Sequence, residues 1–238
     1  MKISGYLGFS LIDYPGKVAF VIFTQGCNFR CPFCHNPELI STRKKGLYSE
    51  DFIIEELLKR KKIINAVVIT GGEPTIQEDL PLFLFKLKKR RLNIKLDTNG
   101  SNPKMLMEIV KSRLVDYVAV DFKTSRVKYH LAIGLEKEEG ERYYKKLLES
   151  LKILKEGDIE YEVRTTVVPE IVEEEDLKLI RDEIGDVPYY LQRFNPENAL
   201  SFEFRKKISY PDDKLIEFRE RLHCELRGVV NSFQNKES

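Results

Sequence analysis

Three cysteines lie close together in the sequence and offer the clearest chemistry. Cys27, Cys31 and Cys34 form a C-x3-C-x2-C pattern in a chain of 238 residues with four cysteines in total. The pattern follows the apolar run 18–23, which predicts a buried strand. The thiols are therefore expected on a loop at a strand end, where α/β folds place their chemistry. Thiolates this close favour a soft metal or an iron–sulfur cluster. Three of them can hold three irons of a [4Fe–4S] cube, with the fourth iron open to a substrate or cofactor.

Other uses of the cysteines are weaker. A structural zinc site could combine the three thiols with His35, although such sites usually take a second pair of ligands from elsewhere in the chain. A disulfide framework needs an oxidising compartment and a more even cysteine usage. Cys224 stands alone, so this chain cannot build a second cluster. The pattern favours one iron–sulfur cluster.

A glycine-rich motif follows the second predicted strand. Gly71-Gly72-Glu73-Pro74 comes directly after the β-branched run 66–70. Tandem glycines let a backbone approach a ligand closely because they carry no Cβ. Alone, the motif could be an ordinary turn, but its place one strand after the cysteines favours contact with a ligand.

Polar residues also end the third and fourth predicted strands. Asp97, Thr98 and Asn99 follow one strand, and Asp121 and Lys123 follow the next. Because the carboxyl ends of parallel strands meet at one edge, these side chains are expected at the same site. The alternatives are helix capping for Asp97 and a surface ion pair for Lys123.

The fifth predicted strand adds two candidates. Arg164 and Thr166 alternate with apolar neighbours and therefore point to one face of the strand. An inward arginine could pair with a carboxylate of the ligand. The alternative is a solvated strand face.

These motifs resemble the radical S-adenosylmethionine superfamily. The resemblance rests on C-x3-C-x-aromatic-C after a first strand and Gly-Gly-Glu-Pro after a second. The flanks 11–16 (Leu-Ile-Asp-Tyr-Pro-Gly) and 34–37 (Cys-His-Asn-Pro) resemble the activating enzymes of glycyl-radical proteins. Among these, they most resemble the enzymes that serve anaerobic ribonucleoside-triphosphate reductase. The resemblance covers roughly residues 3–200.

The resemblance implies a [4Fe–4S] cluster held by the three cysteines, with S-adenosylmethionine at the open iron. It implies that Phe33 stacks on adenine, and that the Gly-Gly-Glu-Pro backbone and Glu73 receive the methionine amino group. The Asp-Thr and Asp-x-Lys positions would lie around the cofactor, where the aspartates can hold a cation. Strand-end pattern and resemblance together assign these residues to the cofactor: Phe33, Gly71, Gly72, Glu73, Pro74, Asp97, Thr98, Asn99, Asp121, Lys123, Arg164 and Thr166.

The implied activity is that of an activase. The reduced cluster would pass one electron to S-adenosylmethionine, and the resulting 5′-deoxyadenosyl radical would take a hydrogen atom from a glycine of a partner protein. The expected partners are anaerobic ribonucleoside-triphosphate reductase and a low-potential electron donor of the flavodoxin or ferredoxin type.

Three other functions stay open. The first is an activase of another glycyl-radical enzyme, such as pyruvate formate-lyase, although Gln192 lies on the last strand, where some of those activases carry a histidine. The second is a radical enzyme acting on a small molecule. The third, from a different class, is a zinc-stabilised binding module.

Composition excludes several partner classes. With 40 basic and 38 acidic residues the net charge is +2, so no global attraction to nucleic acid or membrane is expected. Residues 1–8 lack the apolar core of a signal peptide, and no run approaches the ~20 apolar residues of a membrane span. Reduced thiols suit the cytoplasm.

Strand and helix patterns alternate about six times. Strands are expected at 18–23, 66–70, 94–97, 117–121, 159–168 and 188–194, and helices at 50–62, 80–91, 103–111, before Gly157, at 173–184 and at 212–222. Residues 2–17 and 123–140 are expected to be irregular, and a short run is expected at 228–233. The alternation predicts a single α/β domain over residues 1–238, with its core at about 17–200 and an extension at about 201–238. Six units are too few for a closed eight-fold barrel, so we expect a partial (β/α)6 barrel, a parallel sheet with outer helices whose open flank admits a protein substrate.

Overall fold

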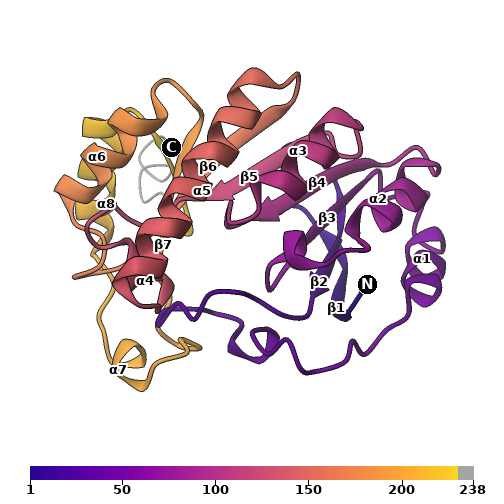
Figure 1. The fold of residues 1–238 in the computed structure, drawn as a ribbon, viewed down its shortest axis with the longest axis horizontal. Coiled ribbons are helices and arrows are strands. Elements are labelled where there is room, and N and C mark those ends of the chain that lie inside the picture. Colours follow the sequence, from indigo (N-terminus) through magenta and orange to yellow (C-terminus); the bar gives the residue numbers. More distant parts are fainter. Residues whose placement is uncertain (230–238) are drawn as a thin grey trace, which may run out of the picture.

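The computed structural model describes residues 1–229, and they build one continuous sheet (Figure 1). Its eight strands lie side by side in chain order, and the described residues show no pairing between the first and the last. The strands are β1 (Ile3–Ser10), β2 (Ala19–Thr24), β3 (Ala66–Gly71), β4 (Asn93–Thr98), β5 (Tyr117–Asp121), β6 (Glu160–Val167), β7 (Tyr189–Arg193) and β8 (Glu225–Arg227). From β2 to β8 every pair is parallel, whereas β1 runs antiparallel to β2. The predicted α/β fold with an open, mainly parallel sheet is confirmed.

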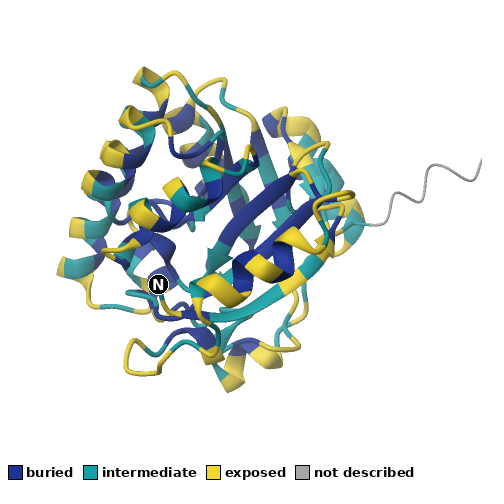
Figure 2. Ribbon diagram, turned by 90° about the vertical axis from the view of Figure 1, so that its right-hand side faces the viewer, coloured by how far each residue is buried: buried dark blue, intermediate teal, exposed yellow. Residues whose placement is uncertain are grey.

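Helices connect the strands and cover the outer face of the sheet (Figure 1). They are α1 (Glu50–Leu58), α2 (Leu80–Lys88), α3 (Pro103–Lys111), α4 (Tyr129–Ile133), α5 (Lys137–Glu156), α6 (Glu174–Ile184), α7 (Phe202–Arg205) and α8 (Asp212–Leu222), with short 3-10 turns η1 (Pro37–Leu39) and η2 (Pro74–Ile76). Figure 2 shows their exposed outer sides and the buried strands behind them. None of the described helices is both long enough and apolar enough to cross a membrane.

The two faces of the sheet differ in polarity. Alternate strand residues such as Phe20 and Ile22 join the large apolar cluster that the helices cover. Their neighbours Ala19 and Val21 belong to a small second cluster with Tyr117 on the inner face. Further along the strands the inner positions become charged, as the next subsection describes. The inner face therefore has an apolar base and a polar upper layer.

Local signals set most helix boundaries. The Ser49 side chain accepts a hydrogen bond from the Phe52 backbone N–H and begins α1. Asn102 caps α3 in the same way, with proline at the first helical position. On α1, Ile53 is fully buried, whereas Phe52 is 39% exposed. Helix α1 also ends at Leu58 rather than 62, and α2 at Lys88 rather than 91.

Two predicted irregular segments contain regular structure. Residues 2–17 include β1, and 123–140 include α4 and the start of α5. Strand β1 is mostly half-buried and contains two glycines, so it lacks the apolar run that marks the other strands. Helix α4 has only five residues, too few for a periodic pattern. Most of the short run predicted at 228–233 lies outside the described residues.

Candidate functional site

A cavity of about 260 Å³ lies at the carboxyl ends of the parallel strands. Cys27, Cys31 and Cys34 all line it, and none of the three takes part in a disulfide. The cavity is also lined by these predicted residues: Phe33, Gly71, Gly72, Glu73, Asp97, Thr98, Asn99, Asp121, Lys123 and Thr166. Pro74 and Arg164 do not line it. Pro74 is buried at the start of η2.

The cysteine loop is held on two sides by backbone hydrogen bonds. On one side, the Gly26 and Cys27 N–H groups donate to the carbonyls of Leu39 and Ile40 at 2.7 and 3.0 Å. On the other, the Arg30 N–H donates to the Ile133 carbonyl, at the end of α4, at 2.8 Å. Burial of Cys27 raises the pKa of its thiol to about 11. Such thiols stay protonated until a metal displaces the proton, so metal loading is expected to release protons.

The donor set fits an iron–sulfur cluster better than a single zinc ion. No group of three His, Cys, Asp or Glu side chains in residues 1–229 converges on a point where one ion could be held. A cluster does not require convergence, because each thiolate binds a different iron. Three soft sulfur donors on one loop, all facing the same cavity, match that requirement.

Two glycines let the end of β3 pack against the cysteine loop. Gly71 has φ +114°, a conformation that L side chains rarely adopt. A Cβ on Gly72 would lie 2.0 Å from the Gly26 carbonyl oxygen. The Glu73 N–H donates to that same carbonyl at 2.8 Å. The backbone of the motif therefore lines the cavity next to the start of the cysteine loop.

The fit at Gly72 gives a testable consequence. Gly72→Ala is expected to lower the free energy of unfolding by about 1–3 kcal/mol, because the new methyl overpacks against rigid backbone. Urea unfolding measures this change. Gly5→Ala is the control, since its Cβ would meet nothing closer than 3.7 Å. Equal stability of the two variants would contradict the close approach of the two loops.

Glu73 is fully engaged inside the protein. Its carboxylate accepts hydrogen bonds from the Thr75 N–H and hydroxyl, the Thr98 hydroxyl and the Asn99 N–H, at 2.5–3.1 Å. Burial raises the pKa of Glu73, and these hydrogen bonds partly offset the rise. The side chain thus ties the end of β3 to the end of β4 and positions the cavity wall.

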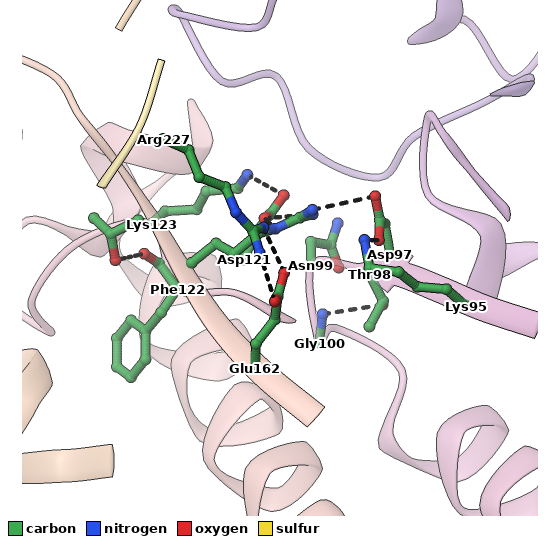
Figure 3. A network of polar contacts seen from close by, with 12 residues as sticks. Lys95, Asp97, Thr98, Asn99, Gly100, Asp121, Phe122, Lys123, Glu162 and Arg227 are labelled. Atoms are coloured by element: carbon green, nitrogen blue, oxygen red, sulfur yellow. Dashed lines mark hydrogen bonds and ion pairs between the residues drawn. The ribbon is translucent and has the colours of Figure 1, made fainter. Parts of the chain in front are cut away.

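Oppositely charged side chains form a network at the cavity, three of whose members line it (Figure 3). Lys95 pairs with Asp97 at 2.6 Å, and Lys123 pairs with Asp121 at 3.0 Å. Arg164 bridges the two aspartates, at 3.2 Å from Asp97 and 2.9 Å from Asp121. Burial acts to raise the pKa of both aspartates, but Arg164 and the lysines outweigh it and lower both values. Both carboxylates are therefore ionised at neutral pH.

Arg164 thus occupies the space between the aspartates, where the resemblance implied a bound cation. It also lines an adjoining cavity of about 560 Å³ that shares His35, Thr166 and Gln192 with the first. Lys123 lines the cavity together with the three cysteines. Burial acts to lower the pKa of Lys123, but Asp121 outweighs it and the pKa is raised.

A second buried ion pair links the last strand to this layer. Glu162 is fully buried and receives two hydrogen bonds from Arg227, at 2.6 and 2.8 Å (Figure 3). The Tyr117 hydroxyl donates to the same carboxylate at 2.8 Å. The Arg227 guanidinium lies 3.8 Å from the centre of the Tyr190 ring. These contacts fix β8 to β6 across β7.

Some lining residues were not assigned to the cofactor from the sequence. They are Phe29, His35, Asn36, Ile40, Thr70 and Gln192. Their neighbours offered a signal, since Thr70 precedes Gly71 on β3, and Phe29, His35 and Asn36 lie within or beside the cysteine pattern. Ile40 carries no such signal, because it reaches the cavity only through the backbone pairing of 39–40 with 26–27.

Comparison with known proteins gives consistent matches. The family model described as Radical SAM superfamily matches residues 21–182. A Methanocaldococcus jannaschii protein named as a glycyl-radical enzyme activating enzyme is 36% identical over 222 residues, covering 92% of this chain and 89% of that protein. The pyruvate formate-lyase-activating enzyme of Streptococcus mutans is 31% identical over 137 residues, covering 51% and 52%. Among solved structures, Streptococcus suis SuiB bound to S-adenosylmethionine has a TM-score of 0.67 at 15% identity, covering 87% of this chain and 50% of that one.

Proposed function

Because the chain belongs to the radical SAM superfamily, whose members use a [4Fe–4S] cluster and S-adenosylmethionine, we propose that it activates anaerobic ribonucleoside-triphosphate reductase by creating its glycyl radical. Homology to glycyl-radical enzyme activating enzymes over most of both chains supports the reaction class. The observation that carries the proposal is one cavity lined by three free cysteines and by Gly71 and Gly72.

The residues of the cavity divide between two ligands. Cys27, Cys31 and Cys34 would hold three irons of the cluster. When bound and reduced, the cluster and S-adenosylmethionine supply the radical that removes a hydrogen atom from the glycine.

The remaining side chains would bind and orient the cofactor. Phe33, 4% exposed at the cavity, would stack on adenine. The backbone of Gly71 and Gly72, where it lines the cavity, would receive the methionine amino group, next to Glu73 and Pro74. Lys123, which lines the cavity, is the better candidate for the methionine carboxylate, since Arg164 is engaged by two aspartates.

The other predicted residues would surround the bound cofactor. Asp97, Thr98, Asn99, Asp121 and Thr166 line the rest of the cavity. Arg164 would hold Asp97 and Asp121 in position through its ion pairs with them. The chain would thereby orient the cofactor and exclude water, and no general base is needed for hydrogen-atom transfer.

The choice of partner rests on the flanks of the cysteine pattern, residues 11–16 and 34–37. A low-potential flavodoxin or ferredoxin would reduce the cluster, in the cytoplasm, where thiols remain reduced. Pyruvate formate-lyase is the second candidate partner, favoured by the match to the Streptococcus mutans activase. Gln192 lines the cavity from β7, the strand that was expected to be the last and on which some of those activases carry histidine.

One experiment separates these partners. The protein, reconstituted anaerobically with iron and sulfide and reduced, is mixed with S-adenosylmethionine and either anaerobic reductase or pyruvate formate-lyase from the same organism. We expect 5′-deoxyadenosine in both mixtures and a glycyl radical, seen by electron paramagnetic resonance, with the reductase alone. A reductase lacking its glycine is the control.

Three outcomes would contradict the proposal. A radical on pyruvate formate-lyase alone would move the function to that partner. Deoxyadenosine with no protein radical would favour a small-molecule substrate. A colourless protein with one zinc would favour the binding module.

A further inference from the structure

A basic segment lies next to the cysteine loop and outside the cavity. Arg43, Lys44 and Lys45 are consecutive and all exposed. Within residues 1–229 no carboxylate forms an ion pair with any of them, whereas Lys59 and Arg60 share Glu56 and Lys86 pairs with Glu50. We call Arg43, Lys44 and Lys45 the basic loop patch. Its three charges are available to a partner.

Hydrogen bonds hold the segment before the patch against the cysteine loop. The Cys27 N–H donates to the Ile40 carbonyl, and the Gln25 side-chain amide donates to the Ser41 carbonyl at 2.9 Å. A Cβ on Gly26 would lie 3.4 Å from the Thr42 side chain. The patch therefore begins one residue after a direct contact with the loop that carries Cys27.

One neighbouring cation extends the positive surface. The Lys2 ammonium donates to the Thr42 carbonyl at 2.9 Å, directly before the patch. Beside the patch lies a hollow of about 400 Å³ that Phe23, Leu39 and Leu47 line together with Lys44, Lys45 and the opposing carboxylate Glu38. An apolar centre with a charged rim is typical of a protein interface.

We propose that the basic loop patch, with Lys2, is the docking surface for a small acidic electron-transfer protein that reduces the cluster. This inference rests on the proposed function, which needs one electron for each cleavage. The donor loses one electron, the iron–sulfur cluster gains it, and no atom is transferred.

Position favours an electron donor over the glycyl-radical partner. The patch lies outside the cavity lining but directly follows residues 40–42, which contact Gly26 and the backbone of Cys27, the residue that would hold the cluster. A protein docked there approaches the cluster and leaves the cavity free for S-adenosylmethionine and the glycine. The three cations, which form no ion pair with a carboxylate of residues 1–229, complement an acidic donor and would speed its association through electrostatic steering.

The test reverses the patch charge. We compare the variant R43E/K44E/K45E with the unchanged protein, after both have been reconstituted with cluster and supplied with S-adenosylmethionine. The reductant is either dithionite or a limiting amount of flavodoxin. NADPH and a flavodoxin reductase keep the flavodoxin reduced. With flavodoxin at low ionic strength, we expect deoxyadenosine formation to fall about tenfold or more in the variant. The difference should shrink as salt approaches 0.15 M, where charges are screened beyond about 8 Å. With dithionite the two proteins should react equally.

A binding measurement removes any dependence on turnover. Titration of oxidised flavodoxin into the protein without cluster should show salt-sensitive binding that the charge reversal weakens by a similar factor.

The control K61E/K62E changes two exposed lysines that precede the first residue of β3. The cysteine loop packs against the last residue of that strand, about 20 Å away along its six residues. This control should behave as the unchanged protein.

The outcomes separate the two proposals. If the unchanged protein forms no deoxyadenosine with dithionite, the proposed function is overturned. A patch variant that accepts electrons from flavodoxin at the normal rate, or a control that fails equally, would overturn the docking surface alone. So would a patch variant that is slow with both reductants.

Discussion

Cys31→Ala is expected to abolish cluster assembly and S-adenosylmethionine cleavage together. Cys31 is buried between Cys27 and Cys34 at the cavity wall, and a three-thiolate site that loses one ligand cannot hold the cube. Iron and acid-labile sulfide should fall to background after reconstitution, the brown absorbance should disappear, and no 5′-deoxyadenosine should form.

Cys224→Ala is the matched control. Cys224 is also a buried free cysteine, but it follows α8 and does not line the cavity. This variant should keep its cluster and activity. Circular dichroism checks folding, and both variants should give the spectrum of the unchanged protein. A Cys31 variant that still cleaves the cofactor would overturn the assignment of the thiols.

Arg164→Met is expected to lower the free energy of unfolding by about 3–5 kcal/mol, because it leaves two buried carboxylates without the cation between them. Methionine keeps most of the side-chain volume, so lost packing contributes little. The measurement is urea unfolding at pH 7. Arg142→Met is the control, since its ion pair with Glu139 is exposed, and such pairs contribute about 0–1 kcal/mol.

The pH dependence provides a second readout. Folding lowers the pKa of Asp97 and of Asp121 below the ordinary value of 3.8. Their ionised forms therefore stabilise the fold above about pH 4, and this contribution is lost as pH falls below 3.8. Arg164→Met should depend less on pH in that range, so its stability should approach that of the unchanged protein on acidification. A constant difference from pH 7 to pH 3 would show that the arginine acts through packing.

The cysteine site was predictable because its signal is local. The spacing of three thiols and their position after an apolar run are properties of one short segment, and the same holds for Gly71-Gly72. Parallel pairing then brings the ends of successive strands to one edge, so Asp97 and Asp121 could be placed near the thiols without knowing their contacts.

The partners of the charged groups could not be predicted. Alternation shows that Arg164 shares a face with Thr166, but its pairing opposite Asp121 depends on the register between β5 and β6. The hydrogen bonds to Glu73 come in part from Thr98 and Asn99 on the neighbouring strand. Strand β1 was missed because its residues form no apolar run. Its antiparallel pairing with β2 also cannot be inferred from the sequence of residues 3–10 alone.

The ion pair between Glu162 and Arg227 has a consequence for the order in which the protein folds while it is synthesised on the ribosome. The carboxylate is synthesised 65 residues before the guanidinium that neutralises it. Until β8 emerges, the interior beside β6 carries a charge that lacks its bidentate partner, and burying such a charge is unfavourable. The inner face of the sheet is therefore expected to stay open to water during most of translation and to close only when the final strand docks.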